Sequence, residues 1–251
     1  MLILKGVHNM SKIIAVCGSP VSGKTTAGLK IAQELYYATN TPVIFIAPDV
    51  NTPALSYLFP RSKDKDLYSL GVALDKTSII KEDILRQIVN PDSMNNFGLL
   101  GFKTGENRYT YPTPTEDKVR ELFRACAEIA PIIFIDCSSC FDNLISEMAM
   151  RESDCVIQLI VPDLRSMGYY SAYEERYNAV GDKCVKIINL MDNDIFLPIE
   201  EVKTHFKNVK LILPYSRSLK QQAITGSLTE RLNDSKYKSA CISIARQVLS
   251  K

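Results

Sequence analysis

The sequence contains no tryptophan, only two histidines and no long hydrophobic run. None of its apolar stretches approaches the ~20 residues that a membrane-spanning helix needs, so we predict no transmembrane segment. The apolar stretch near the N-terminus is too short for a secretory signal. Together these absences favour a cytoplasmic protein.

Cysteine is present in an odd number, seven, and most of the cysteines lie within apolar runs. Buried, reduced thiols in a cytosolic protein are the simplest interpretation of this pattern. Cys137 and Cys140 have the CxxC spacing of a zinc site, but there is no second CxxC and the histidines are only His8 and His205. The supply of ligands therefore argues against a zinc site.

The chain also lacks a Pro/Gly-rich linker, a low-complexity tract and a tandem repeat. Its 251 residues are enough for one large domain, so we predict a lead-in over residues 1–11 and a single domain over residues 12–251. The net charge of +2 is unevenly spread, because residues 201–251 carry ten Lys/Arg against three Asp/Glu. Solvated helix faces account for this excess, and a surface for an anionic partner is the alternative.

Short apolar runs alternate with helical patterns along the whole sequence. Such runs are typical of parallel strands that helices cover on both faces. The alternation predicts a doubly wound, mostly parallel sheet with helices on both faces, a three-layer α/β/α fold. The expected strands are 13–17, 43–47, 132–136, 155–161, 184–190 and 210–213, with a short extra strand over 97–102. The expected helices are 24–37, 81–89, 116–130, 143–150, 167–180, 200–207 and 228–249.

A glycine-rich segment follows the first expected strand and opens the first expected helix. Its pattern, Gly18-x4-Gly23-Lys24-Thr25, fits the Walker A phosphate loop in the required context. Glycines let backbone N–H groups approach phosphates, and the helix N-terminus adds a positive dipole end. Lys24 would reach the β- and γ-phosphates, and the Thr25 hydroxyl would ligate Mg²⁺. We therefore predict Mg²⁺ and ATP (GTP is less favoured) as cofactors, bound by Gly18, Ser19, Pro20, Val21, Ser22, Gly23, Lys24, Thr25 and Thr26.

Carboxylates follow two of the expected strands, at the edge of the sheet where ligands bind in such folds. Asp136 ends the strand 132–136, which is the Walker B arrangement, in which the acid holds Mg²⁺ through a water. Asp49 follows the strand 43–47 and would orient or deprotonate the attacking water. A simple turn aspartate is the alternative for Asp49, and a polar cap on the strand is the alternative for Asp136.

These motifs resemble one family, the MinD/ParA-like P-loop ATPases, over nearly the whole chain. Ser19-Pro-Val-Ser-Gly-Lys-Thr-Thr26 is similar to the family's K-G-G-x-G-K-T-T loop, and Ala47-Pro-Asp-Val-Asn51 to its acidic turn D-x-D-x-Q. Asn189 lies where the family's asparagine recognises adenine, and Pro214 begins a segment that resembles the family's I-P-Y-D. The resemblance implies base contacts from Asn189 and Pro214, and a homodimer that forms on ATP binding.

Two departures from the family pattern bear on its activity. Ser19 replaces the signature lysine that reaches across the dimer to the partner's nucleotide, and Ala47 replaces the first aspartate after the second strand. A cation at the transferring phosphate contributes several powers of ten to such rates, so its loss predicts slow hydrolysis. Irregular loops of this kind resemble the CpaE/TadZ-like branch of pilus and secretion systems.

Three functions fit these features. The first is an ATP-dependent dimerising ATPase that positions or partitions a cargo, either DNA or a cell-surface machine, with a protein partner. The second is a CpaE/TadZ-like localisation factor that binds nucleotide with little or no hydrolysis. The third is a small-molecule kinase or ATP-dependent ligase, since one fold serves many functions. For the first, the lysines of the basic C-terminal part, Lys203, Lys207, Lys210, Lys236 and Lys238, would hold nonspecific DNA.

Overall fold

The structure is a computed structural model that describes residues 11–194 and 196–251. The expected lead-in, residues 1–11, lies outside the described residues except for Ser11. Within them the chain forms one seven-stranded sheet in which every pair of neighbouring strands is parallel. The strand order is β3-β2-β4-β1-β5-β6-β7. The strands are β1 (Lys12–Gly18), β2 (Val43–Ala47), β3 (Phe97–Gly101), β4 (Ile132–Asp136), β5 (Cys155–Ile160), β6 (Cys184–Asn189) and β7 (Leu211–Leu213).

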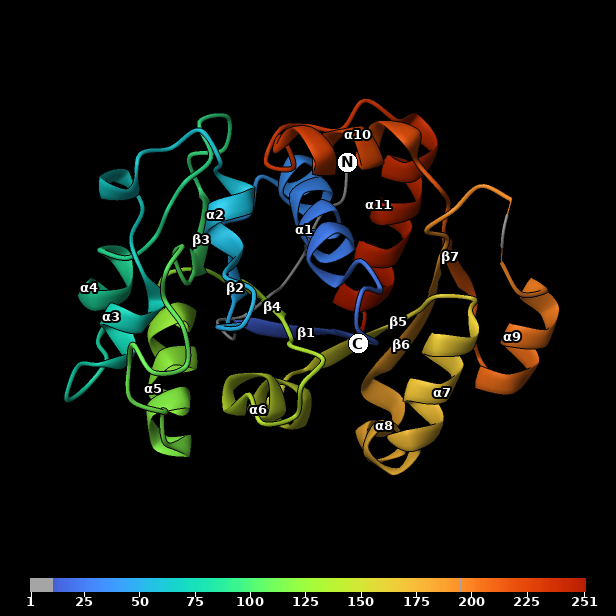
Figure 1. Ribbon diagram of the computed structural model, residues 1–251, viewed down its shortest axis with the longest axis horizontal. Coiled ribbons are helices and arrows are strands. Elements are labelled where there is room, and N and C mark those ends of the chain that lie inside the picture. The colour runs from blue at the N-terminus through green and yellow to red at the C-terminus, as the bar shows by residue number, and fades with distance from the viewer. Residues whose placement is uncertain (1–10, 195) are drawn as a thin grey trace.

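Helices cover both faces of this sheet (Figure 1). The helices are α1 (Lys24–Thr39), α2 (Ala54–Leu58), α3 (Leu70–Leu74), α4 (Lys81–Leu85), α5 (Glu116–Ala127), α6 (Leu144–Glu152), α7 (Leu164–Ala172), α8 (Glu174–Val180), α9 (Ile199–Phe206), α10 (Arg217–Thr225) and α11 (Ser235–Leu249), with 3-10 turns at Asp64–Asp66 and Gly181–Lys183. Helices α1, α2, α10 and α11 pack on one face, and α3 to α9 pack on the other. The predicted three-layer α/β/α fold is therefore confirmed.

Alternation along the central strands sends side chains into two separate cores. In β1, Ile14 and Val16 pack toward α1 and α11, whereas Ala15 and Cys17 pack toward the opposite layer. Every residue of β4 is buried. The strands are unbroken apolar runs in the sequence because a strand covered on both faces has no exposed side on which polar residues would be favoured.

The structure corrects three expected helices. The helix expected over 167–180 is broken at Tyr173 into α7 and α8, and the final helix begins at Ser235 rather than at 228. Asp234 caps α11 by accepting a hydrogen bond from the Tyr237 N–H at 3.0 Å. The helix expected over 81–89 ends at Leu85, because the chain then turns back and Val89 bridges Leu99. The helix α10 is a feature that the sequence analysis missed.

A buried lysine connects α1 with the segment that follows α10. Lys30 is 1% exposed, and its ammonium donates hydrogen bonds to the carbonyls of Leu228 at 2.6 Å and Glu230 at 2.8 Å. The Gln33 side chain accepts a third at 3.0 Å. Burial lowers the pKa of Lys30 to about 8. Three acceptors offset the desolvation of the ammonium. Because the carbonyls of Leu228 and Glu230 bind Lys30, residues 228–230 do not form the first turn of the final helix.

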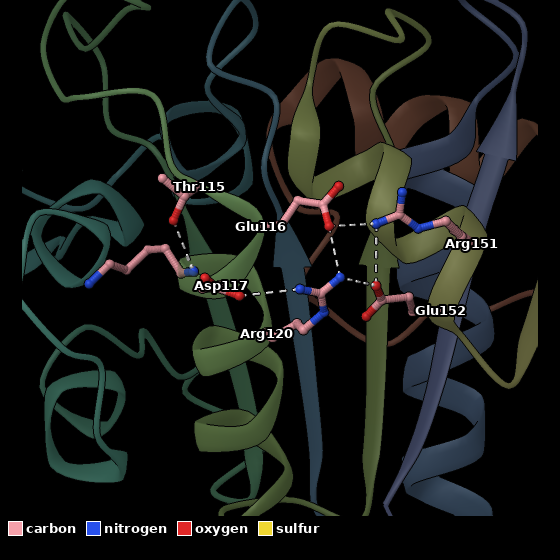
Figure 2. A network of polar contacts seen from close by, with 7 residues as sticks. Thr115, Glu116, Asp117, Arg120, Arg151 and Glu152 are labelled. Atoms are coloured by element: carbon pink, nitrogen blue, oxygen red, sulfur yellow. Dashed lines mark hydrogen bonds and ion pairs between the residues drawn. The ribbon is translucent and has the colours of Figure 1, made fainter.

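Exposed ion pairs connect α5 with α6 on the surface (Figure 2). Glu116 contacts Arg120 at 2.8 Å within α5 and Arg151 at 3.1 Å on α6, and Arg120 contacts Glu152 at 3.1 Å. The Thr115 hydroxyl accepts a hydrogen bond from the Lys118 N–H and so caps α5. Exposed pairs of this kind contribute only about 0.2–1 kcal/mol each. We call the four charged residues Glu116, Arg120, Arg151 and Glu152 the α5–α6 network.

Candidate functional site: a phosphate-loop cleft

The phosphate loop runs from the end of β1 to the start of α1, at the carboxyl edge of the sheet. Gly23 has φ 77°, a left-handed conformation that favours glycine, and a Cβ there would lie 2.9 Å from the Met191 sulfur. A Cβ on Gly18 would lie 2.4 Å from Ser22 Oγ and 3.2 Å from the Leu159 carbonyl. Side chains at either position would collide with neighbours, so the tight loop requires both glycines.

Lys24 opens α1 and extends its ammonium back over the loop. The ammonium donates hydrogen bonds to the Ser19 carbonyl at 3.0 Å and to the Ser139 hydroxyl. Ser139 in turn donates to the Gly18 carbonyl at 2.9 Å. Burial lowers the pKa of Lys24, and the nearby Asp136 carboxylate opposes that shift. These contacts hold a cation beside the backbone that the sequence predicts will bind phosphate.

Thr25 and Asp136 meet on the other side of the loop. The Thr25 hydroxyl donates a hydrogen bond to Asp136 Oδ2, and Tyr57 from α2 donates to the Thr25 oxygen at 3.3 Å. Burial raises the pKa of Asp136 to about 6, although Thr25 and Lys24 oppose the shift. Among the described residues the buried Asp136 Oδ1 has no hydrogen-bond partner. A buried carboxylate oxygen without a partner is what a metal ion or its water would satisfy.

Asp49 lies in the turn after β2 and faces the same cleft. Its carboxylate accepts hydrogen bonds from the Ser138 hydroxyl at 3.1 Å and from the Asn51 N–H at 2.9 Å. The cleft measures about 830 Å³, and Lys24, Thr25, Asp49 and Asp136 all line it. The structure therefore brings the predicted cation, metal ligands and second carboxylate together.

A smaller pocket of about 140 Å³ adjoins the loop on its other side. Asn189 at the end of β6 and Pro214 after β7 both line it, together with Gly23 and Thr26. The Asn189 amide is 4% exposed and donates a hydrogen bond to the Ser22 carbonyl at 2.9 Å. The two predicted base-contacting residues thus share a pocket that begins at the phosphate loop.

The remaining loop residues differ in exposure. Pro20 and Val21 form the exposed tip, and Val21 has a φ of 63°. Ser22 is buried, and its hydroxyl has no partner among the described residues. Ser19 is only 2% exposed and lies 3.4 Å from the Ser166 hydroxyl of α7. The residue at the signature-lysine position is therefore directed into the protein.

Three functional candidates were missed in the sequence analysis: Ser138, Ser139 and Tyr57. Ser138 and Ser139 hold Asp49 and Lys24 through their hydroxyls. Their place directly after the strand that ends in Asp136 is a signal that marks them as cleft residues. Tyr57 has no such signal, because α2 brings it to Thr25 through tertiary packing. Its pKa is raised to about 12, chiefly by burial.

The ligand set at the phosphate loop suits Mg²⁺, and the cysteines of the described residues form no cluster with other ligands. The described residues contain no group of three or more His, Cys, Asp or Glu side chains that could hold a metal ion. Cys137 is buried and Cys140 is exposed, and all seven cysteines are free. Mg²⁺ takes few protein ligands beside phosphate oxygens, and a hydroxyl with one carboxylate is such a set.

None of the described helices has the length and apolar character needed to cross a bilayer.

Comparisons with known proteins give matches to solved structures alone. No family model and no curated protein sequence matches the chain. The MinD cell division protein of Aquifex aeolicus has a TM-score of 0.73 with this structure, at 16% sequence identity, covering 96% of this chain and 98% of that chain. The fold is that of the MinD/ParA ATPases.

Two other MinD/ParA-type structures were solved with bound nucleotide. MinD from Pyrococcus horikoshii, complexed with Mg-ADP, has a TM-score of 0.70 at 16% identity and covers 95% of this chain and 96% of that one. A candidate plasmid partition protein from Borrelia burgdorferi, bound to AMPPNP, has a TM-score of 0.69 at 17% identity, with 96% and 98% covered. At these identities the likeness establishes the fold alone.

Proposed function

We propose that this chain binds Mg·ATP in the phosphate-loop cleft and acts as a dimerising ATPase that positions or partitions a cargo. The convergence of Lys24, Thr25, Asp49 and Asp136 on one cleft carries this proposal. The Mg-ADP and AMPPNP bound by two proteins of the same fold support it. The cargo would be DNA or a cell-surface machine, in the cytoplasm.

Each residue of the cleft then has a distinct task. The N–H groups of the loop and the start of α1 would hold the phosphates, and Lys24 would exchange Ser139 for the β- and γ-phosphates. Thr25 would ligate Mg²⁺, and Asp136 would hold it through a water. Bound Mg²⁺ supplies charge neutralisation at the phosphates. Asp49, which Ser138 orients, would accept a proton from the attacking water.

The base of ATP would occupy the pocket that Asn189 and Pro214 line. The Asn189 amide nitrogen donates to the Ser22 carbonyl at 2.9 Å and to the Met191 sulfur at 3.1 Å, so the amide oxygen is the group that would accept from an exocyclic amine. Adenine carries that donor, whereas guanine presents a carbonyl at the same place. This supports ATP over GTP.

The rim of the cleft carries apolar side chains that a second copy or a protein partner would cover. Val21 is 77% exposed and Met191 is 43% exposed. Val21 and Met191 line the cleft itself, so nucleotide binding and docking would occur at the same rim. Exposed apolar groups that cluster in this way mark interaction sites.

The basic C-terminal part is divided by the fold. Lys203 lies on α9, which packs on the face opposite to α11, the helix that carries Lys236 and Lys238 (Figure 1). Lys203 is also paired with Glu200 at 2.8 Å. Nonspecific DNA binding is therefore proposed for the α11 lysines alone, with strong weakening by salt.

The Lys24→Ala substitution tests the nucleotide site. The lysine is directed to the cleft rather than to the core, so we expect the variant to fold like the wild type by circular dichroism. We expect isothermal titration to show no measurable Mg·ATP binding to it. The matched control is Lys65→Ala, an exposed lysine outside the cleft, which should bind ATP like the wild type. Unchanged affinity in folded Lys24→Ala protein would remove the proposal.

A second candidate, a nucleotide-dependent localisation factor with little hydrolysis, is favoured by the burial of Ser19. A 2% exposed serine that faces Ser166 offers no cation to a partner's nucleotide. We expect phosphate release from the wild type, without partner, to be close to the Lys24→Ala background. We also expect Ser19→Lys to raise it if the new side chain reaches the rim. Fast release by the wild type alone would exclude this candidate.

A further inference from the structure

A second cavity, of about 130 Å³, adjoins the phosphate-loop cleft. Loops that follow β2, β3 and β4 form its walls. Asn51, Cys140 and Asp142 line both this cavity and the cleft, so the two spaces have a common wall. Nothing in the proposed Mg·ATP site uses the cavity, which we name the side cavity.

The side cavity has a mixed lining in which apolar side chains contribute the larger part. Leu74, Phe102 and Ile145 are buried there, Val50 and Tyr111 are half-buried, and polar side chains such as Asn107 and Asn143 also line it. A wholly apolar cavity of about 150 Å³ is known to hold a benzene molecule, and the side cavity is of similar volume. The space therefore matches one branched aliphatic or aromatic side chain.

Two opposite charges from different loops line the same cavity. Arg108 lies in the loop between β3 and α5, and Asp142 lies in the loop between β4 and α6. The pKa of Asp142 is lowered, first by a hydrogen bond from the Cys140 thiol and also by Arg108. Among the described ion pairs none joins Arg108 to Asp142 within 4.0 Å. Both side chains are exposed, and the Arg108 guanidinium carbon lies 5.8 Å from the centre of the Tyr109 ring.

The opposite charges of Arg108 and Asp142 determine which charges a ligand of the side cavity can carry. A simple carboxylate would meet Arg108 but be repelled by Asp142, and a simple amine would have the reverse problem. A zwitterion satisfies both charges while its apolar part fills the interior. We propose that the side cavity binds an α-amino acid with an apolar side chain, with its carboxylate on Arg108 and its ammonium on Asp142.

The common wall would let this ligand act on the phosphate-loop cleft. Cys140 N–H donates to the Ser138 hydroxyl at 3.2 Å, and that hydroxyl donates to Asp49 at 3.1 Å. Asn51 N–H donates to the other oxygen of Asp49 at 2.9 Å. An occupant of the side cavity would therefore touch the residues that orient Asp49. Its binding does not depend on the ATPase proposal, because the side cavity is complete without nucleotide.

Fluorine NMR with three matched probes tests the proposal on the whole chain, without nucleotide. The probes are 4-fluoro-L-phenylalanine, 4-fluorophenylacetate, which lacks the ammonium, and 4-fluorophenethylamine, which lacks the carboxylate. Arg108 and Asp142 are exposed, so solvent screens each charged contact and its effect on affinity is at most about fivefold. We expect the amino acid to bind about two to five times more tightly than either of the other probes.

Three variants locate the binding. Arg108→Gln should remove the advantage of the amino acid over the amine, and Asp142→Asn its advantage over the carboxylate. Thr113→Trp, an exposed wall position, should block all three probes while thermal unfolding shows an intact fold. The control is Arg124→Gln, an exposed arginine on α5 outside the side cavity, which should behave as the wild type.

Several results would overturn the proposal. These are equal affinity of the three probes, no amino-acid binding at millimolar concentrations, or binding that survives both Arg108→Gln and Thr113→Trp in folded protein. The Mg·ATP titration of Arg108→Gln is a separate measurement, and we expect wild-type affinity because Arg108 does not line the phosphate-loop cleft. Failure of the amino-acid site would thus be distinguished from failure of the nucleotide site.

Discussion

The phosphate-loop cleft and the α5–α6 network both gather acidic and basic side chains, but they do so under opposite conditions. In the cleft, Asp136 is 6% exposed and keeps an oxygen without a partner among the described residues. In the network, Glu116 and Arg120 are nearly half exposed; Glu116 has two partners of opposite charge, and Arg120 has three, including Asp117. Burial raises the pKa of Asp136, whereas ion pairing lowers the pKa of Glu116.

The two regions differ in what their charges would do: the Asp136 carboxylate would bind a ligand, whereas the charges of the α5–α6 network add stability. The fold keeps Asp136 at a cost, since burial disfavours its ionised form. Glu116 is ionised easily and its contacts are satisfied within the protein. A buried carboxylate with an unpaired oxygen therefore indicates a ligand site, and a satisfied exposed cluster does not.

The Asp136→Asn substitution should produce the largest contrast between the two regions. An amide can keep the Thr25 hydrogen bond but cannot hold a metal-bound water as a carboxylate does. We expect Mg·ATP affinity to fall about 10- to 100-fold, and the free energy of unfolding to stay the same or rise, because a buried charge is removed. Isothermal titration and urea unfolding measure the two. Asp92→Asn, at an exposed position, is the matched control and should change neither.

The pH dependence of stability should have opposite signs in the two regions. The pKa of Asp136 is about 6 in the fold against an ordinary 3.8, so the folded state holds a proton that the unfolded chain has lost. Its stabilising contribution is present below pH 3.8 and is lost as the pH rises through 6. Ion pairing lowers the pKa of Glu116 below 4.5, so its contribution is present above pH 4.5 and is lost as the pH falls.

Urea unfolding between pH 3.5 and 7 checks this, with Asp136→Asn and Glu116→Gln compared with the wild type. The advantage of the wild type over Asp136→Asn should shrink as the pH rises toward about 6. Its advantage over Glu116→Gln should shrink as the pH falls below about 4.5. The same trend with pH in both variants would contradict the comparison.

The Arg120→Ala substitution should have the smallest effect. Arg120 is exposed and its contacts with Glu116 and Glu152 are screened by solvent, so we expect only a small loss in the free energy of unfolding. Mg·ATP affinity should not change. The loss should shrink in high salt, because exposed ion pairs are screened. A loss that salt leaves untouched would mean that packing of the arginine stem, rather than charge, stabilises this surface.

The strands of this fold were predictable because each is buried on both faces. The ranges 43–47 and 132–136 agree with β2 and β4 at both ends. The helices were harder, because their lengths depend on contacts distant in sequence. Tyr173 breaks one expected helix into two, and the Lys30 contacts with the 228–230 carbonyls shorten the last. No local pattern signals the break at Tyr173, whereas Asp234 is a local N-cap signal for the start of α11 that the sequence analysis did not use.

The candidate site divides in the same way. The loop from Gly18 to Thr26, with Lys24 and Thr25, is contiguous in sequence and could be found from spacing alone. Asp136 and Asp49 followed from the rule that strand ends meet at one edge of the sheet. The tasks of Ser139 and Tyr57 depend on where distant elements pack, and the side cavity depends on three loops at once. Sequence spacing alone does not predict which distant segments pack against one another in this way.

Lys30 has a consequence for how the chain is made. It belongs to the helix that begins at the phosphate loop, yet two of its acceptors lie 198 and 200 residues further along. During synthesis on the ribosome, the Lys30 ammonium has neither of these two acceptors until almost the whole chain has emerged. A nascent chain that stops before residue 228 would have to bury an uncompensated charge or leave α1 undocked. The contacts that hold Lys30, and with it the docking of α1, are therefore complete only once residues 228–230 have been synthesised.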